Sequence, residues 1–229
     1  MNLDLTGKLA LVTGSTRGIG LATATGLAQL GAEVIFNGRE ATAVADAIAK
    51  IKQAAPAAQA HAAVFDLGGA EGCAGLVAQF PEVDILVNNL GIYEPKAFFD
   101  IEDDDWIRMF EVNVMSGVRL TRHYLKRMLD HKEWGRVVFV SSESAVFVPK
   151  EMVHYGFSKA AQLYIARGVA AAALCCAGRD REPDLLPLLE GLERYQWCCP
   201  ARRWRPGLRG RSRRPRWRCP APPTASSVP

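Results

Sequence analysis

The sequence predicts an α/β fold, a doubly wound parallel sheet of the Rossmann type with helices on both faces. Two observations indicate this fold. Over the first 170 residues, short apolar runs without polar alternation are separated by helical stretches, which is the pattern of strands buried on both faces. A glycine-rich turn also joins the first apolar run to the first helical stretch, as in nucleotide-binding domains of this class.

The elements follow one another in regular alternation. The predicted strands are Leu9–Val12, Glu33–Phe36, Ala62–Phe65, Ile85–Val87 and Val137–Val140. The predicted helices are Leu21–Leu30, Ala41–Ala55, Ala70–Gln79, Asp103–Asp130 and Gly156–Ala170. Gly31 fits the C-terminal cap of the first helix, and the acidic residues 103–105 fit the first turn of the fourth, where the helix dipole is positive.

The glycine-rich turn has the chemistry of a phosphate-binding loop. Gly14, Gly18 and Gly20 allow a tight turn and a close approach of the backbone to a pyrophosphate, next to the unpaired N–H groups of a helix N-terminus. Their spacing is Gly-x-x-x-Gly-x-Gly and not the usual Gly-x-Gly-x-x-Gly, so an ordinary glycine turn is the alternative interpretation. The predicted cofactor contacts in this loop are Gly14, Ser15, Arg17, Gly18, Ile19 and Gly20.

Tyr155 and Lys159 form a second candidate site. Residues at positions i and i+4 share one face of a helix, so the lysine ammonium can lie beneath the phenol and favour its ionised form. Such a pair is suited to proton transfer. The spacing alone is common in helices, and Ser142, thirteen residues before the tyrosine, adds to it.

Several motifs together give the chain a resemblance to the classical short-chain dehydrogenase/reductase family, from residue 1 to about 170. In chain order they are Thr13-Gly14-x-x-x-Gly18-x-Gly20, Asp66, Asn88-Asn89-Leu90-Gly91, Asn113, Ser142 and Tyr155-x-x-x-Lys159. Leu90 departs from the alanine that is usual in its turn. The resemblance implies a bound nicotinamide cofactor and hydride transfer between that cofactor and a carbonyl or alcohol.

The resemblance also implies the catalytic roles. Ser142 and Tyr155 would bind the substrate oxygen, and Tyr155 would donate the proton. Lys159 would hold the cofactor ribose, and Asn113, an unusual residue inside a long helix, would hold a water in a proton relay. The spacing to Tyr155 selects Ser142 over its serine neighbours. His123 and His154 have no evident partner and are expected to be surface or helix residues.

The remaining cofactor contacts follow from the same resemblance. Asp66, with Leu67, would contact the adenine, although Asp66 is equally well interpreted as a helix N-cap. Asn89 would support the fourth strand on the nicotinamide side, and Gly91 would leave room for the cofactor. No metal site is predicted.

The choice of cofactor is argued from charge. NAD-binding sites place an acidic residue near the end of the second strand, whereas this strand ends Phe36-Asn37-Gly38-Arg39. Arg17 and Arg39 are suited to a 2′-phosphate, and Asn37, two residues before Arg39, is a further predicted cofactor contact. We therefore favour NADP. NAD remains the alternative if Glu40 lies at the strand end.

The composition changes abruptly after residue 170. Residues 1–170 contain 16 basic and 19 acidic residues, whereas residues 171–229 contain 12 and 5, together with 9 of the 13 prolines and 5 of the 6 cysteines. We interpret residues 171–229 as an irregular tail read in a shifted frame. In place of this tail the family has two further strands, a Pro-Gly turn and a substrate lid, so residues 1–170 are predicted to be an incomplete domain.

Three alternative interpretations of the tail are kept open. Its arginines and tryptophans could bind nucleic acid, which we consider the less favoured interpretation. A zinc site is the second interpretation, but the adjacent cysteine pairs lack the Cys-x-x-Cys spacing of such sites, so thiols without a metal are favoured. The Leu-rich stretch 184–193 could form a short docking helix.

The predicted function is an NAD(P)-dependent oxidoreductase acting on a small carbonyl or alcohol. The alternative is a catalytically dead scaffold that binds a nucleotide or a partner, with the basic tail as its interaction element. Family resemblance predicts a homodimer or homotetramer formed through the long helices. The chain has no membrane-spanning stretch and no signal peptide, and Cys73 is the only cysteine before residue 171, so a cytoplasmic location is expected.

Overall fold

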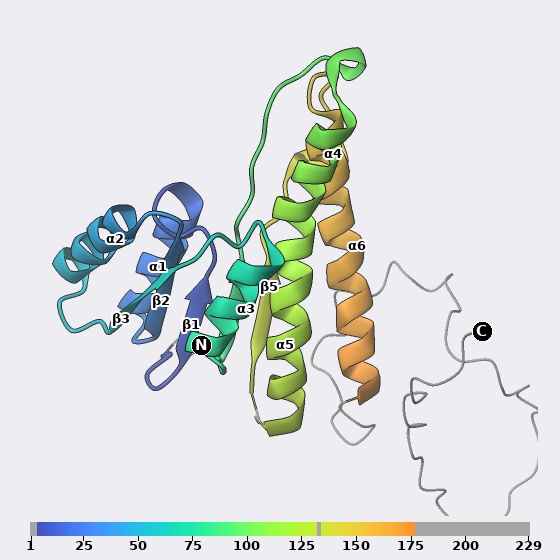
Figure 1. Cartoon of the computed structure of the whole chain (residues 1–229). Helices are drawn as coiled ribbons and strands as arrows, with labels where there is room; N and C mark the ends of the chain where they lie inside the picture. The colour runs from blue at the N-terminus through green and yellow to red at the C-terminus, as the bar shows by residue number, and fades with distance from the viewer. Residues whose placement is uncertain (1–3, 132–133, 177–229) are drawn as a thin grey trace, which may run out of the picture. The chain divides into compact units, whose positions relative to one another are not determined.

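The computed structural model describes residues 4–131 and 134–176, which form a five-stranded parallel sheet with helices between the strands (Figure 1). The strands are β1 (Leu9–Val12), β2 (Glu33–Gly38), β3 (Ala60–Val64), β4 (Ile85–Asn88) and β5 (Arg136–Phe139). The longer helices are α1 (Gly18–Gln29), α2 (Ala41–Ala54), α3 (Ala70–Gln79), α4 (Asp103–Phe110), α5 (Ser116–His131) and α6 (Val153–Cys176). The parallel α/β fold class predicted from the sequence is confirmed.

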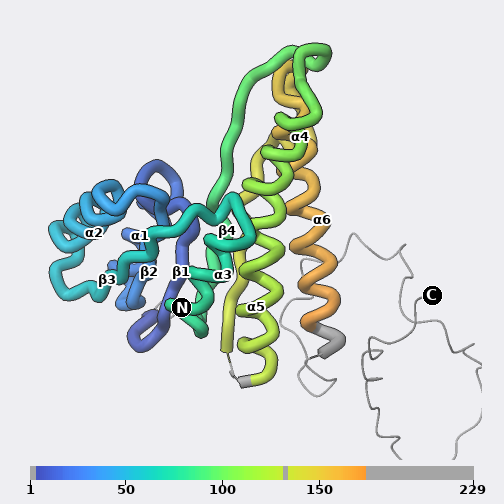
Figure 2. Tube along the Cα trace, in the orientation of Figure 1, coloured from blue at the N-terminus to red at the C-terminus, as the bar shows by residue number. Residues whose placement is uncertain are grey.

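Two hydrophobic cores cover the two faces of the sheet. Because successive side chains of a strand point to opposite faces, Ala10 and Val12 of β1 pack with α1 and α2, whereas Leu11 packs with α3 and α5. All three side chains are fully buried. Helix α6 packs against α5 and β5, as the tube in Figure 2 shows.

The strand order is β3-β2-β1-β4-β5, so the chain reverses direction across the sheet between β1 and β4. Open parallel sheets bind ligands outside the carboxyl ends of the strands at such a reversal. The glycine-rich turn follows β1 and residues 89–91 follow β4, so both motifs lie at this point.

The structure corrects the prediction for the long helix Asp103–Asp130. The segment is helical throughout, but a π-helical turn at Glu111–Met115 separates α4 from α5, and Asn113 lies within it. The acidic start of α4 is confirmed, since Glu102 and Asp105 form a reciprocal capping box. Gly31 also has the left-handed conformation expected just after α1, with φ of 94°.

Two element boundaries differ usefully from the prediction. Strand β2 continues to Gly38, which places Arg39 immediately after it. Helix α6 begins three residues before Gly156 and continues past residue 170 to Cys176. The remaining predictions for the tail, including a helix at 184–193, fall on residues 177–229 and lie outside the described residues.

Within residues 4–131 and 134–176, no helix is long and apolar enough to cross a membrane. The same residues contain no group of three or more histidine, cysteine or acidic side chains that could hold a metal ion.

Candidate active site

The glycine-rich turn after β1 is shaped by three glycines with different constraints. Gly14 and Gly18 have φ of 62° and 56°, a region that L-residues with side chains avoid. Gly20 is needed for space, because a Cβ there would lie 2.4 Å from the Gly14 carbonyl oxygen and 2.5 Å from Asn89 Nδ2. A Cβ at Gly18 would meet nothing within 4 Å, so the loop is open on that side.

The N-terminus of α1 is free to receive an anion. Arg17 is its N-cap, is exposed, and forms no side-chain capping hydrogen bond. The Arg17 side chain therefore does not use the N–H donors of the first helical turn, and the helix dipole adds positive potential there. Ile19, in this first turn, is 67% exposed. The open loop, the free donors and the nearby arginine fit the diphosphate of a dinucleotide.

Asn37 at the end of β2 anchors the loop. Its side-chain Oδ1 accepts a hydrogen bond from the Gly14 N–H at 3.1 Å, and its Nδ2 donates to the carbonyls of Ala63 and Phe65, each at 3.1 Å. Its backbone N–H donates to Ser15 Oγ at 2.9 Å. Asn37 and Ser15 are both buried. The structure thus gives their side chains the task of holding the loop against β2 and β3.

Thr13 and Asn89 tie β1 to β4 in the same way. Thr13 Oγ1 accepts the N–H groups of Asn89 and Leu90 at 3.0 and 2.9 Å. Asn89 Nδ2 donates to the carbonyls of Thr13 and Gly14 at 2.8 and 3.1 Å. Sequence reasoning placed Thr13 in the motif but missed its role, which is to hold the segment after β4 against the end of β1.

Arg39 and Asp66 lie beyond the carboxyl ends of β2 and β3, and both are exposed. Asp66 does not cap α3, whose N-cap is Gly69; its Oδ1 instead accepts the Gly68 N–H at 3.0 Å. The N-cap interpretation of Asp66 is therefore wrong. Leu67 is buried in the core beneath, so its backbone alone is placed to contact a ligand.

Ser142 lies three residues beyond the end of β5, at the N-terminus of a short 3-10 helix, Glu143–Ala145. Its Oγ accepts the Ser144 N–H at 3.2 Å. This segment packs on the first turn of α6, where a Cβ on Gly156 would lie 2.8 Å from the Ser144 carbonyl oxygen. The close approach brings the serine loop onto the turn of α6 that carries Tyr155. The Tyr155 ring is half-buried, with its centroid 6.2 Å from that of Tyr93 in an edge contact.

Lys159 lies one turn further along α6 and is 5% exposed. Its Nζ donates to the Val140 carbonyl at 2.9 Å and to Gln162 Oε1 at 3.1 Å, and it lies 5.7 Å from the centroid of the Tyr155 ring. Burial lowers the pKa of Lys159 to about 8, because the charged form loses solvation. The ammonium therefore still predominates at pH 7.

The Asn113 side chain forms hydrogen bonds to protein groups at both ends of its amide. Its Oδ1 accepts the Ile92 N–H at 2.7 Å, and its Nδ2 donates to the Ile92 carbonyl and to Ser158 Oγ, each at 2.9 Å. Its backbone carbonyl accepts Gln162 Nε2 at 2.5 Å. Asn113 thus joins the segment after β4 to α6.

Gly91 lies where these groups meet. A Cβ there would lie 3.4 Å from Asn113 Oδ1 and 3.5 Å from Lys159 Nζ. The glycine therefore keeps open the space beside the buried amide and ammonium. The site contains a proton donor, a buried cation and a nearby serine, which is a set of groups suited to acid–base chemistry on an oxygen atom.

Sequence reasoning missed two polar side chains of this site. Ser158 and Gln162 are buried in α6, and Ser158 Oγ donates to the Tyr155 carbonyl at 2.7 Å while accepting Asn113 Nδ2. The signal that could have found them is their position, since Ser158 directly precedes Lys159 and Gln162 follows it by about one helical turn.

The prediction for the two histidines is partly wrong. His154 is in α6, as allowed, but it is buried, with its Nδ1 unpartnered among the described residues and its ring edge-on to Trp106 at 6.0 Å between centroids. His123 has a partner, the Pro81 carbonyl oxygen, 2.9 Å from Nε2.

A comparison with family models decides the classification. The model described as short chain dehydrogenase matches residues 8–173. The chain belongs to the short-chain dehydrogenase family. The match extends three residues past the predicted end of the globular part.

A curated relative supports this assignment. The uncharacterized oxidoreductase YvaG of Bacillus subtilis strain 168 is 55% identical over 173 residues, which are 76% of this chain and 65% of YvaG. The chain thus spans just under two thirds of the length of YvaG.

Two solved structures of the family resemble this chain. A 3-oxoacyl-(acyl-carrier-protein) reductase of Agrobacterium tumefaciens C58 with NADP bound is 32% identical, with a TM-score of 0.71 over 77% of this chain and 68% of that one. The L-sorbose reductase of Gluconobacter frateurii, complexed with NADPH and L-sorbose, is 28% identical, with a TM-score of 0.72 over the same shares.

Proposed function

We propose that the chain forms the nucleotide-binding and catalytic part of an NADP-dependent oxidoreductase that interconverts a carbonyl and an alcohol. The observation that carries this proposal is the meeting of Asn113 and Lys159 beside Gly91, at the reversal point of the sheet, with the Tyr155 ring centroid 5.7 Å from Lys159 Nζ. The glycine loop at the end of β1 lies at the same reversal point. Family membership supports both assignments.

The roles of the side chains follow from their chemistry. A bound nicotinamide supplies or accepts the hydride. In reduction, the hydroxyls of Ser142 and Tyr155 donate hydrogen bonds to the carbonyl oxygen, and the Tyr155 proton moves to that oxygen as negative charge develops. The ammonium of Lys159 favours the phenolate that remains, because the two groups share one face of α6.

Removal of the Tyr155 hydroxyl tests this mechanism. We expect Tyr155→Phe to reduce kcat/KM by about 100-fold or more, because it removes the proton donor, while NADPH binding stays near that of the wild-type protein. The assay is NADPH oxidation by the full chain with a ketose, a ketoaldonate and a 3-ketoacyl thioester.

Tyr164→Phe is the matched control, since Tyr164 lies on the same helix and is 73% exposed. Turnover by the wild-type chain that equals turnover by Tyr155→Phe would contradict the mechanism. Turnover of one substrate class would define the substrate.

The preference for NADP is supported by the two exposed arginines, Arg17 and Arg39, beyond the ends of β1 and β2. Glu40, the acidic alternative, is the N-cap residue of α2 and lies two residues beyond the end of β2. The solved relatives named above contain NADP or NADPH.

We expect Arg39→Ala to weaken NADPH binding by about tenfold through the loss of a guanidinium–phosphate contact. NADH binding should be unchanged, since NADH has no 2′-phosphate. Fluorescence titration of both cofactors measures the two affinities, with Arg108→Ala, an exposed arginine of α4, as the control. Equal losses for NADH and NADPH would contradict the assignment of Arg39.

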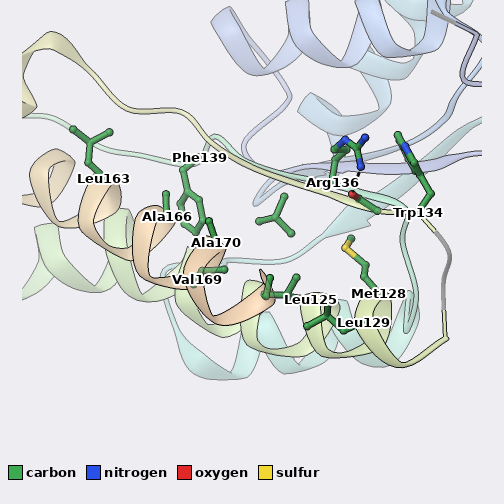
Figure 3. Close-up of a pocket in the computed structure, with 13 residues that line it drawn as sticks. Leu125, Met128, Leu129, Trp134, Arg136, Phe139, Leu163, Ala166, Val169 and Ala170 are labelled. Carbon is green, nitrogen blue, oxygen red and sulfur yellow. Dashed lines mark hydrogen bonds between the residues drawn. The ribbon is translucent and has the colours of Figure 1, made fainter. Parts of the chain in front are cut away.

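A second candidate, a scaffold that binds nucleotide without turnover, is favoured by one observation. A cavity of about 620 Å³ lies beside β5, between α5 and α6, and Figure 3 shows Leu163, Ala166 and Ala170 of α6 near Phe139 of β5. Within the described residues β5 is an edge strand. Because β5 leads into the Ser142 segment, incomplete packing there would loosen the serine and lower turnover before it lowered NADPH binding. NADPH binding without turnover of any substrate would support this candidate.

A further inference from the structure

Gln162 forms a direct bridge between two parts of the candidate site. Its side chain is 1% exposed, and both ends of its amide are used. Oε1 accepts from Lys159 Nζ at 3.1 Å, and Nε2 donates to the backbone carbonyl of Asn113 at 2.5 Å. One side chain thus connects the lysine of α6 to the π-helical turn between α4 and α5.

The bridge determines how the Lys159 ammonium is used. An ammonium has three N–H donors. Among the described residues, one binds the Val140 carbonyl and one binds Gln162 Oε1. The third donor remains for a ligand, and the space beside Gly91, 3.5 Å from Nζ, is where a ligand can approach. Among the residues that the structure describes, Gln162 is the acceptor that holds the ammonium on the side of the π-helical turn.

The π-helical turn places the Asn113 carbonyl within reach of this amide. A water held by Asn113 could pass protons, whereas a primary amide does not exchange its protons readily. The amide bridge therefore fixes the position of the Lys159 ammonium. It does not provide a route for protons, as a water molecule in the same position would.

We infer that Gln162 is a positioning residue of the site, which bridges the Asn113 carbonyl and the Lys159 ammonium and orients the lysine toward the cofactor ribose. This inference rests on the proposed function for its catalytic consequence. Its geometric content, the orientation of Lys159 by Gln162, is measurable without turnover.

The test uses the full chain with Gln162→Leu, which removes both hydrogen bonds at similar volume. Thr121→Val is the matched control, because Thr121 is buried in α5 and accepts one hydrogen bond from Asn88 Nδ2 at 3.1 Å. Gln162→Met serves as a second substitution if the leucine variant does not fold. Each protein is titrated with NADPH and is also labelled with an amine acetylating reagent, followed by mass spectrometry.

We expect Gln162→Leu to weaken NADPH binding by about tenfold, the equivalent of one hydrogen bond to a charged group. Acetylation of Lys159 should be about three- to tenfold faster, because the amine loses an acceptor that holds it. Lys126, which is 77% exposed, is the internal standard and should not change.

Equal acetylation of Lys159 in the wild-type protein and Gln162→Leu would overturn the inference, as would effects no larger than those of Thr121→Val. A wild-type chain that binds NADPH without turnover would contradict the proposed function alone. The acetylation rates would still decide the role of Gln162 in that case.

Discussion

Lys159 carries its charge in a nearly buried position, and this has a cost in stability that depends on pH. In the unfolded chain lysine titrates near pH 10.5, whereas burial lowers the pKa of Lys159 to about 8 in the folded chain. Between these values the unfolded chain binds a proton that the folded chain does not. Stability from this group therefore rises as the pH increases through that window.

This linkage gives a prediction for Lys159→Met. Relative to the variant, the wild-type protein should gain up to about 3 kcal/mol in free energy of unfolding between pH 8 and pH 10.5. Urea denaturation without cofactor at both pH values measures the gain. Lys126→Met, at an exposed lysine, should show a constant difference from wild type. A constant difference for Lys159→Met as well would show that its burial is not costly.

At the scale of single residues, the sequence predicts the reactive groups better than the groups that hold them. Tyr155 and Lys159 are recognisable because their chemistry requires a fixed spacing on one helix. Gln162 is not recognisable, because a glutamine in a helix is ordinary. Its role depends on the hydrogen bond from its Nε2 to the Asn113 carbonyl oxygen, 2.5 Å away in a segment distant in sequence. Hydrogen bonds between distant segments are set by tertiary packing, which a single sequence does not display.

At the scale of elements, the glycine loop is predictable in position but not in detail. Sequence reasoning identified Gly14, Gly18 and Gly20 together, yet the structure gives them different constraints, with positive φ at two and a lack of space at the third. The π-helical turn at Asn113 was not predicted, because residues 103–130 were interpreted as one continuous helix.

Two glycines of α1 differ in whether the surrounding structure leaves space for a side chain. A Cβ at Gly20 would lie within 3 Å of the Gly14 carbonyl and Asn89 Nδ2, so Gly20→Ala should destabilise the chain by about 1–3 kcal/mol. NADPH affinity should also fall, because the loop must shift. A Cβ at Gly26 would meet nothing within 4 Å, so Gly26→Ala should stabilise the helix by about 0.5–1 kcal/mol.

Thermal denaturation and NADPH titration of the two alanine variants check this contrast. Destabilisation by both substitutions would mean that helix α1 tolerates no side chain at either position. Stabilisation by both would mean that the loop after β1 adjusts without cost.

At the scale of the whole molecule, the doubly wound parallel sheet was predictable, because parallel α/β units connect in few ways. The cavity beside β5 was only partly predictable. The composition change after residue 170 predicted an incomplete domain that lacks two strands, but α6 continues past that boundary, and Ala173 of α6 lines the cavity.

A cavity of this size, lined mostly by apolar side chains, should bind a hydrophobic dye. We expect anilinonaphthalene sulfonate to fluoresce with the folded full chain, and Ala166→Glu, within the cavity, to reduce this signal by about half or more through the burial of a charge. Ala172→Glu, at an exposed position on the same helix, should leave the signal unchanged. The absence of a signal from the wild-type chain would mean that the cavity is filled in solution.

The hydrogen bonds of Asn37 limit how this domain could be re-engineered. Because both ends of its amide hold the loop and the neighbouring strand, an acidic replacement at Asn37, made to select a cofactor without the 2′-phosphate, would remove the donor that binds the Ala63 and Phe65 carbonyls. A change of cofactor preference, by design or by evolution, is therefore expected at Arg39 and beyond. Side chains there can vary without loosening the sheet.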